Sequence, residues 1–122
     1  MKQSFTFWSF ANRGLAPEQL FQAAAQIGFD AVELVDEVLF PLVTQTGLEL
    51  SAHRAFDSIE QGLNRKENHE GIFKEFEANL KLASQWSIPG LICFSGNRDG
   101  IADALIRNSS TGEATAKLMI TE

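Results

Sequence analysis

Residues 28–35 have the sequence Gly-Phe-Asp-Ala-Val-Glu-Leu-Val, and this stretch decides the fold class. From Ala31 to Val35 the run is short and apolar, contains β-branched valines, and is interrupted only by the carboxylate of Glu33. Such a run is typical of a strand buried on both faces, as in a parallel sheet. Gly28 in front of it supplies the left-handed residue that commonly ends a helix. A helix followed by a buried strand predicts an α/β protein.

The residues upstream of Gly28 predict that helix and a strand before it. Pro17 followed by Glu18 is a helix start, because proline suits the first helical turn and an acid there complements the helix dipole. Apolar residues then recur at three- and four-residue spacing, which predicts a helix over 17–27 with one buried face. β-forming residues dominate 4–10, which predicts the first strand.

The residues downstream of the opening stretch continue the alternation. A short helix is predicted over 40–46 and a strand over 48–53. A long polar connection (54–68) then leads to the longest helix (69–86), which is followed by a fourth strand (91–94) and a turn-rich loop (95–100). Strands alternating with helices are typical of α/β proteins with a parallel sheet and right-handed crossovers.

Two architectures with this alternation compete. A doubly wound sheet often carries G-x-G-x-x-G after its first strand, whereas residues 12–15 contain a single glycine. A barrel needs no such motif and places its functional side chains at the carboxyl ends of its strands. Polar residues follow the predicted strands here: Asn12 and Arg13, Glu33 and Asp36, His53 and Arg54, Asn97 and Arg98.

Composition and charge limit the class of protein and its partners. With 122 residues, 44% hydrophobic and 21% charged, the chain has the composition of a globular domain, which excludes disordered and fibrous classes. Its net charge of −6 has the wrong sign for binding nucleic acid or an anionic membrane, so we expect neither partner. A small polar ligand fits better. The single cysteine, Cys93, forms no internal disulfide, and we expect a cytoplasmic location.

Four short strings of residues carry a resemblance to a known family. They are Phe7-Trp8-Ser9-Phe10, Gly28-Phe29-Asp30-Ala31-Val32-Glu33-Leu34, Gly62-Leu63-Asn64-Arg65-Lys66-Glu67-Asn68-His69 and Phe94-Ser95-Gly96-Asn97-Arg98. Over residues 1–103 the chain resembles the N-terminal half of the hydroxypyruvate isomerase-like proteins of the xylose isomerase-like TIM-barrel superfamily. A complete TIM barrel takes about 250 residues. The resemblance therefore implies a partial (β/α)₈ barrel of about four βα units.

The resemblance also implies an activity. It is the aldose–ketose type isomerisation of hydroxypyruvate to tartronate semialdehyde through an enediolate, which needs a general base and a group that holds the oxyanion. In the family, the catalytic glutamates and the metal ligands of metal-dependent relatives lie on strands of the second half. No catalytic or metal-binding residue is therefore assigned here, while a divalent metal stays open for full-length relatives. We expect the 122 residues alone to bind substrate without turnover.

The resemblance ends after Asp103. Residues 104–122 are polar and lack both a sustained helical stripe and a following apolar strand. We expect an N-terminal half-barrel over 1–103 and an atypical tail over 104–122. The hypothesis for this tail is a frame-shifted or disordered end on a truncated product.

Two candidate binding residues lie on the predicted strands. Glu33 is a carboxylate in an apolar strand, which indicates either a pocket residue or a structural acid paired with a cation such as Arg13. His53 ends the third strand, where an imidazole can bind a hydroxyl or polarise a carbonyl of a small hydroxy-carbonyl acid or sugar. The alternative for His53 is a framework histidine.

Four more candidates lie in or beside loops. Asn64 lies in a connection longer than usual and His69 directly follows it, which favours a functional role for both. The alternative is that Asn68 caps the long helix and His69 merely begins it. Asn97 and Arg98 follow the fourth strand, where backbone amides and a guanidinium can hold a carboxylate or a sugar oxygen. The alternative there is a solvated turn.

Two rival interpretations remain open. The first is a non-catalytic half-barrel that acts by self-association or by binding a small polar ligand, because four strands leave two unpaired edges and an uncovered apolar sheet face. Such edges favour a homo-oligomer. The second is a small doubly wound domain, whose first strand would lie inside the sheet instead of at its edge.

Overall fold

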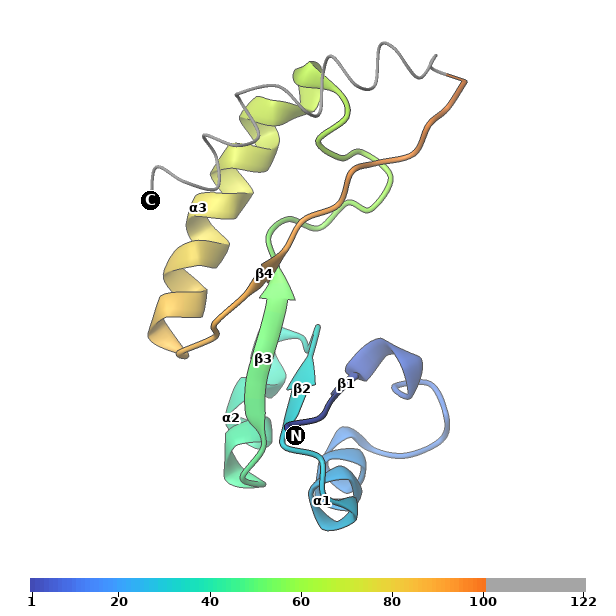
Figure 1. Cartoon of the computed structure of the whole chain (residues 1–122), viewed down its shortest axis with the longest axis vertical. Coiled ribbons are helices and arrows are strands. Elements are labelled where there is room, and N and C mark those ends of the chain that lie inside the picture. The colour runs from blue at the N-terminus through green and yellow to red at the C-terminus, as the bar shows by residue number, and fades with distance from the viewer. Residues whose placement is uncertain (101–122) are drawn as a thin grey trace. The chain divides into compact units, whose positions relative to one another are not determined.

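The computed structural model describes residues 1–100 of the chain (Figure 1). The chain divides into two compact units. Of the described residues, the first unit comprises 1–54 and 80–92, and the second comprises 55–79 and 93–100. The predicted tail over 104–122 and its boundary at 103 lie outside the described residues.

The first unit contains a sheet of four parallel strands. The strands are β1 (Ser4–Thr6), β2 (Ala31–Glu33), β3 (Glu49–Arg54) and β4 (Leu91–Ile92), and they lie in the order β1-β2-β3-β4. Figure 1 shows β1, β2 and β3 side by side, with the helix α2 (Phe40–Gln45) beside β3. The predicted parallel α/β fold is confirmed, and β1 lies at an edge of the sheet, where the doubly wound alternative does not place it.

The α-helices agree in position with those predicted, whereas the 3-10 helices were not predicted. The helix α1 (Pro17–Ile27) has the predicted bounds, and Gly28 ends it with a left-handed φ of 106°. The remaining helices are α3 (His69–Gln85) and three short 3-10 helices, η1 (Phe7–Ser9), η2 (Glu37–Leu39) and η3 (Lys66–Asn68). None of the helices described is long and apolar enough to cross a bilayer.

Three predicted strands are shorter than expected. The first ends at Thr6, because η1 turns the chain and the Phe7 ring packs against Phe21 of α1 at a centroid distance of 5.5 Å. The strand predicted over 31–35 ends at Glu33, where the register with β3 shifts and Leu34 adopts a φ of 56°. The fourth strand ends at Ile92, because the next part of the chain pairs with a loop: the carbonyl of Phe94 accepts a hydrogen bond from the N–H of Leu63.

The hydrophobic core of the first unit lies on one face of the sheet. Its centre is formed by Phe21, Val32 and Phe40, which are fully buried, and it also contains residues of α1, of α2 and of the end of α3. In strands, alternate side chains point to opposite faces. Phe5 and Val32 point into this core, so their neighbours point away from it: Ser4, Thr6, Ala31 and Glu33.

The composition of this second face corrects an expectation. An uncovered apolar face was predicted, but on β1 and β2 the face carries one alanine among serine, threonine and glutamate. Among the described residues, the apolar side chains of β1 and β2 pack against helix residues on the core face, which accounts for the polar residues on the other face. On β1 and β2, therefore, the expected uncovered apolar face is not found.

Candidate functional site

The carboxyl ends of β1 and β2 hold the first candidate, Glu33. Its Oε1 accepts a hydrogen bond of 2.6 Å from the hydroxyl of Thr6, its register partner on β1. Both side chains are half-buried. Among residues 1–100 no ion pair joins Glu33 to Arg13, so the proposed pairing with that cation is wrong. The partner of the Glu33 carboxylate is instead the neutral hydroxyl of Thr6. The carboxylate is thus fixed in orientation at the strand end.

An ion pair joins the next two strand ends. Arg54 Nη1, at the end of β3, lies 3.5 Å from Asp36 Oδ1, which follows β2. The Asp36 side chain is 56% exposed, so the pair contributes at most about 1 kcal/mol to stability. Neither residue was among the sequence candidates, although each follows or ends a predicted strand. Two carboxylates and one guanidinium therefore lie at the carboxyl ends of neighbouring strands.

His53 also lies near this end of β3, but it is only 3% exposed. Its ring packs edge to face against Phe40 at a centroid distance of 5.3 Å, and its backbone N–H donates to the carbonyl of Gly90 at 3.0 Å. The histidine is thus held against the core and joins β3 to the start of β4. This placement favours the framework alternative over direct contact with a ligand.

The second unit brings three other candidates together. Asn64 is 3% exposed, and its Nδ2 donates to the carbonyl of Asn97 at 2.9 Å while its backbone N–H donates to Ser95 at 2.8 Å. The ring nitrogen Nε2 of His69 lies 2.9 Å from the carbonyl of Leu63, beside Asn64 in the chain. Residues 60–64, residues 94–97 and the first residue of α3 are thereby joined.

Two glycines allow these segments to meet backbone to backbone. Gly96 has a φ of 94°, and a Cβ there would lie 2.6 Å from the backbone nitrogen of Gly62, closer than real Cβ atoms approach. A hydrogen bond of 2.8 Å from the N–H of Asn97 to the carbonyl of Glu60 closes the pair. We call residues 60–64 with 94–97 the loop clasp. It unites the third and fourth strings that carry the family resemblance.

The residues around the loop clasp complete the unit. Asn97 and Arg98 are exposed, and an ion pair of 3.1 Å between Arg65 Nη2 and Asp99 Oδ2 links the two loops beyond the clasp. Asn68 belongs to η3, and its Nδ2 donates to the carbonyl of Gly62 at 3.2 Å. His69 is the first residue of α3, as the structural alternative states, and it contacts the loop as well.

Metal-binding and thiol chemistry find little support in the described residues. Within residues 1–100 no three side chains of His, Cys, Asp or Glu lie together as a metal site. Burial raises the pKa of the Cys93 thiol, which keeps it protonated at neutral pH and unsuited to nucleophilic attack.

The candidate residues thus fall into two groups. Glu33 and His53 belong to the first unit, whereas Asn64, His69, Asn97 and Arg98 belong to the second. No protein-family model matches the chain, and no curated protein or solved structure matches it. A functional assignment therefore rests on the strand order and on these two groups of side chains.

Proposed function

We propose that residues 1–100 are the first four βα units of a TIM barrel similar to hydroxypyruvate isomerase. The observation that carries the proposal is the strand order, because four parallel strands follow one another in chain order with β1 at an edge. Consecutive strands of a barrel are neighbours in this way. Helices α1, α2 and α3 lie between successive strands in the sequence, which also agrees with βα units.

The proposed ligand is a small hydroxy-carbonyl acid or a sugar. At the strand ends, Glu33 accepts a hydrogen bond from Thr6 and keeps a second carboxylate oxygen for a ligand hydroxyl. The second unit, taken by itself, contains Arg98, which carries a guanidinium, a group that binds carboxylates through two parallel hydrogen bonds. The loop clasp fixes the backbone just before Arg98, so this side chain starts from a rigid base.

The proposed role is binding without chemistry. Isomerisation through an enediolate requires a base that moves a proton between adjacent carbons. In the family that base lies on strands beyond those present in residues 1–100. The 122-residue chain alone is therefore expected to bind hydroxypyruvate and to leave it unconverted.

Nuclear magnetic resonance tests this proposal. Titration of the ¹⁵N-labelled chain with hydroxypyruvate should shift amide signals in residues 94–98, and Arg98→Gln should weaken binding about tenfold, as loss of a charge-assisted contact does. Lys81→Gln on α3 is the matched control, since it removes one exposed positive charge outside the loops. Equal weakening in both variants, no binding at all, or formation of tartronate semialdehyde would each contradict the proposal.

A further inference from the structure

A cavity of about 640 Å³ lies in the first unit, at the amino ends of the strands. Its walls include Lys2, Ser4, Glu49, Ser51, Trp86 and Ser87. Glu33, Thr6 and Arg54 lie at the opposite, carboxyl ends of β2, β1 and β3. The cavity is therefore a separate feature, which the proposed function does not use. Its volume falls within the roughly 300–1,000 Å³ of small-molecule sites.

The cavity exists because β4 is short. Along β3, pairing with β4 begins only at His53. The N–H of His53 donates to the carbonyl of Gly90, the residue before β4. The segment before Gly90 passes the first half of β3 without joining the sheet, since Ser87 adopts a φ of 55° and Pro89 has no N–H to donate. Residues 49–51 of β3 and residues 86–89 therefore line a space where a longer strand would otherwise pair.

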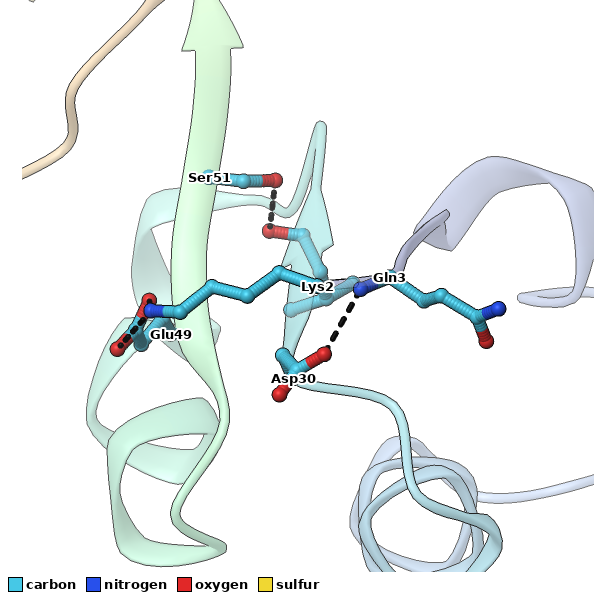
Figure 2. A network of polar contacts seen from close by, with 6 residues as sticks. Lys2, Gln3, Asp30, Glu49 and Ser51 are labelled. Atoms are coloured by element: carbon cyan, nitrogen blue, oxygen red, sulfur yellow. Dashed lines mark hydrogen bonds and ion pairs between the residues drawn. The ribbon is translucent and has the colours of Figure 1, made fainter.

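The charged groups of this cavity cancel one another. Lys2 Nζ lies 3.3 Å and 3.2 Å from the two carboxylate oxygens of Glu49, and Figure 2 shows the lysine side chain reaching across to that carboxylate. They are the charged residues among those that line the cavity. The lining thus has no net charge, so an anion gains little attraction there, especially in a chain of net charge −6.

The uncharged polar groups of the cavity supply both donors and acceptors. Ser4, Ser51 and Ser87, which carry hydroxyl groups, are among the residues that line it. The hydroxyl of Ser51 makes a long hydrogen bond of 3.4 Å to the carbonyl of Val32, as Figure 2 shows, and it keeps its acceptor capacity. A ligand with several hydroxyl groups matches such a lining, because each hydroxyl both donates and accepts.

Trp86 supplies the aromatic part of the wall. Its ring is half-buried and packs edge to face on Phe40 at a centroid distance of 5.5 Å, which holds the indole in place. Indole offers apolar area together with one N–H donor, a combination that suits the mixed C–H and O–H surface of a sugar.

We propose that this amino-end cavity binds a small neutral polyhydroxy compound of monosaccharide size. The neutral lining excludes a preference for anions, the hydroxyl groups supply matched hydrogen bonds, and the indole covers a C–H face. This site is independent of the proposed hydroxypyruvate contacts, because neither Glu33 nor Arg98 lines the cavity.

Fluorescence of a single tryptophan tests the proposal directly. Trp8→Phe leaves Trp86 as the one tryptophan, and Trp8 does not line the cavity. In this variant, titration with D-xylose or D-glucose should change the Trp86 emission in a saturable way, and Ser51→Leu, which fills the cavity, should reduce the affinity at least about tenfold. Absence of saturation with both sugars, or equal affinity in the Ser51→Leu variant, would overturn the proposal.

Charge variants test the neutrality argument. Glu49→Gln leaves the positive charge of Lys2 uncompensated. This variant should therefore bind D-gluconate about threefold to tenfold more tightly than the parent chain does, whereas its affinity for D-xylose should stay within about twofold of the parent value. Glu18→Gln on α1 is the matched control, because it changes the total charge equally at a residue outside the cavity. If gluconate binding becomes tighter by the same factor in both variants, the electrostatic effect does not arise from the charges in the cavity, and the proposal is contradicted.

Discussion

Gly96 and Gly62 illustrate how much a single side chain can disturb in this molecule. Gly96→Ala forces a Cβ onto the backbone of Gly62 and retains a left-handed φ, so we expect it to destabilise the fold by about 2–4 kcal/mol. Gly71→Ala is the control, because Gly71 lies in α3 with open space around it and alanine favours a helix. Urea denaturation measures both. If Gly96→Ala is no less stable than Gly71→Ala, the loop clasp is not a tight contact.

Thr6 tests the strand-end hydrogen bond at Glu33. Thr6→Val keeps the side-chain shape and removes the donor, so we expect a loss of about 1 kcal/mol. Thr44→Val is the control, since Thr44 is exposed and donates only to a carbonyl one turn back in α2. A double-mutant cycle with Glu33→Gln isolates the pair, and a coupling energy indistinguishable from zero would refute the contact.

Cys93 is half-buried directly after β4, and its thiol can be titrated. Burial raises the pKa of its thiol, so iodoacetamide should alkylate the native chain more slowly than the urea-unfolded chain, with a midpoint at higher pH. The sign for stability follows. As pH rises past the usual thiol pKa, the unfolded chain loses this proton first, so the free energy of unfolding falls until the native thiol also ionises.

Cys93→Ala provides the control for this pH dependence. The chain has one cysteine, so the variant should lose all alkylation and also the alkaline decline in stability that comes from the thiol. A native alkylation rate that equals the unfolded rate across the pH range would contradict the raised pKa. The same result would also mean that the thiol is exposed instead of half-buried.

At the scale of elements, local signals predicted the helices better than the strands. The helix α1 has its predicted bounds because Pro17 and Gly28 each act within one turn of the chain. The ends of β1, β2 and β4 depend on contacts between distant residues, such as the packing of Phe7 on Phe21. The Thr6 to Glu33 contact was missed for the same reason, because it requires the register of β1 against β2.

Among the binding candidates, too, features that depend on contacts between distant residues were harder to predict than local ones. The contact between Asn64 and Asn97 joins two of the loops in which candidate residues were predicted, and both residues lie in the loop clasp. The burial of His53 against Phe40 was not predictable from its place at a strand end, because a register shift between β2 and β3 sets which way the following side chains point.

The helix α1 is anchored to the sheet through Phe21. This ring is fully buried and packs on Phe7, so Phe21→Ala should cost about 3–5 kcal/mol through lost burial and the cavity left behind. Phe73→Ala on α3 is the control, because Phe73 is 43% exposed and should cost under about 1 kcal/mol. Thermal unfolding followed by circular dichroism measures both, and similar losses would contradict the assigned core.

At the scale of the whole molecule, the open edge of β1 is the feature that favours self-association. Within the described residues β1 pairs with β2 on one side only. The carbonyl of Gln3 accepts from the N–H groups of Asp30 and Ala31, so by alternation the backbone groups of Ser4 face the open edge. Such an edge can pair with that of a second copy. Because β1 has three residues and the adjacent face is polar, the association should be weak and should depend on concentration.

Substitution at Ser4 tests this edge. Ser4→Pro removes the outward N–H and is tolerated at a sheet edge, so sizing chromatography with light scattering should show less dimer at a given concentration than for the parent chain. Ser4→Ala is the matched control, since it removes the same exposed hydroxyl and keeps the N–H. If Ser4→Ala reduces the dimer as much, the side chain and not the strand edge makes the contact. A parent chain of 13.5 kDa at every concentration would exclude edge pairing altogether.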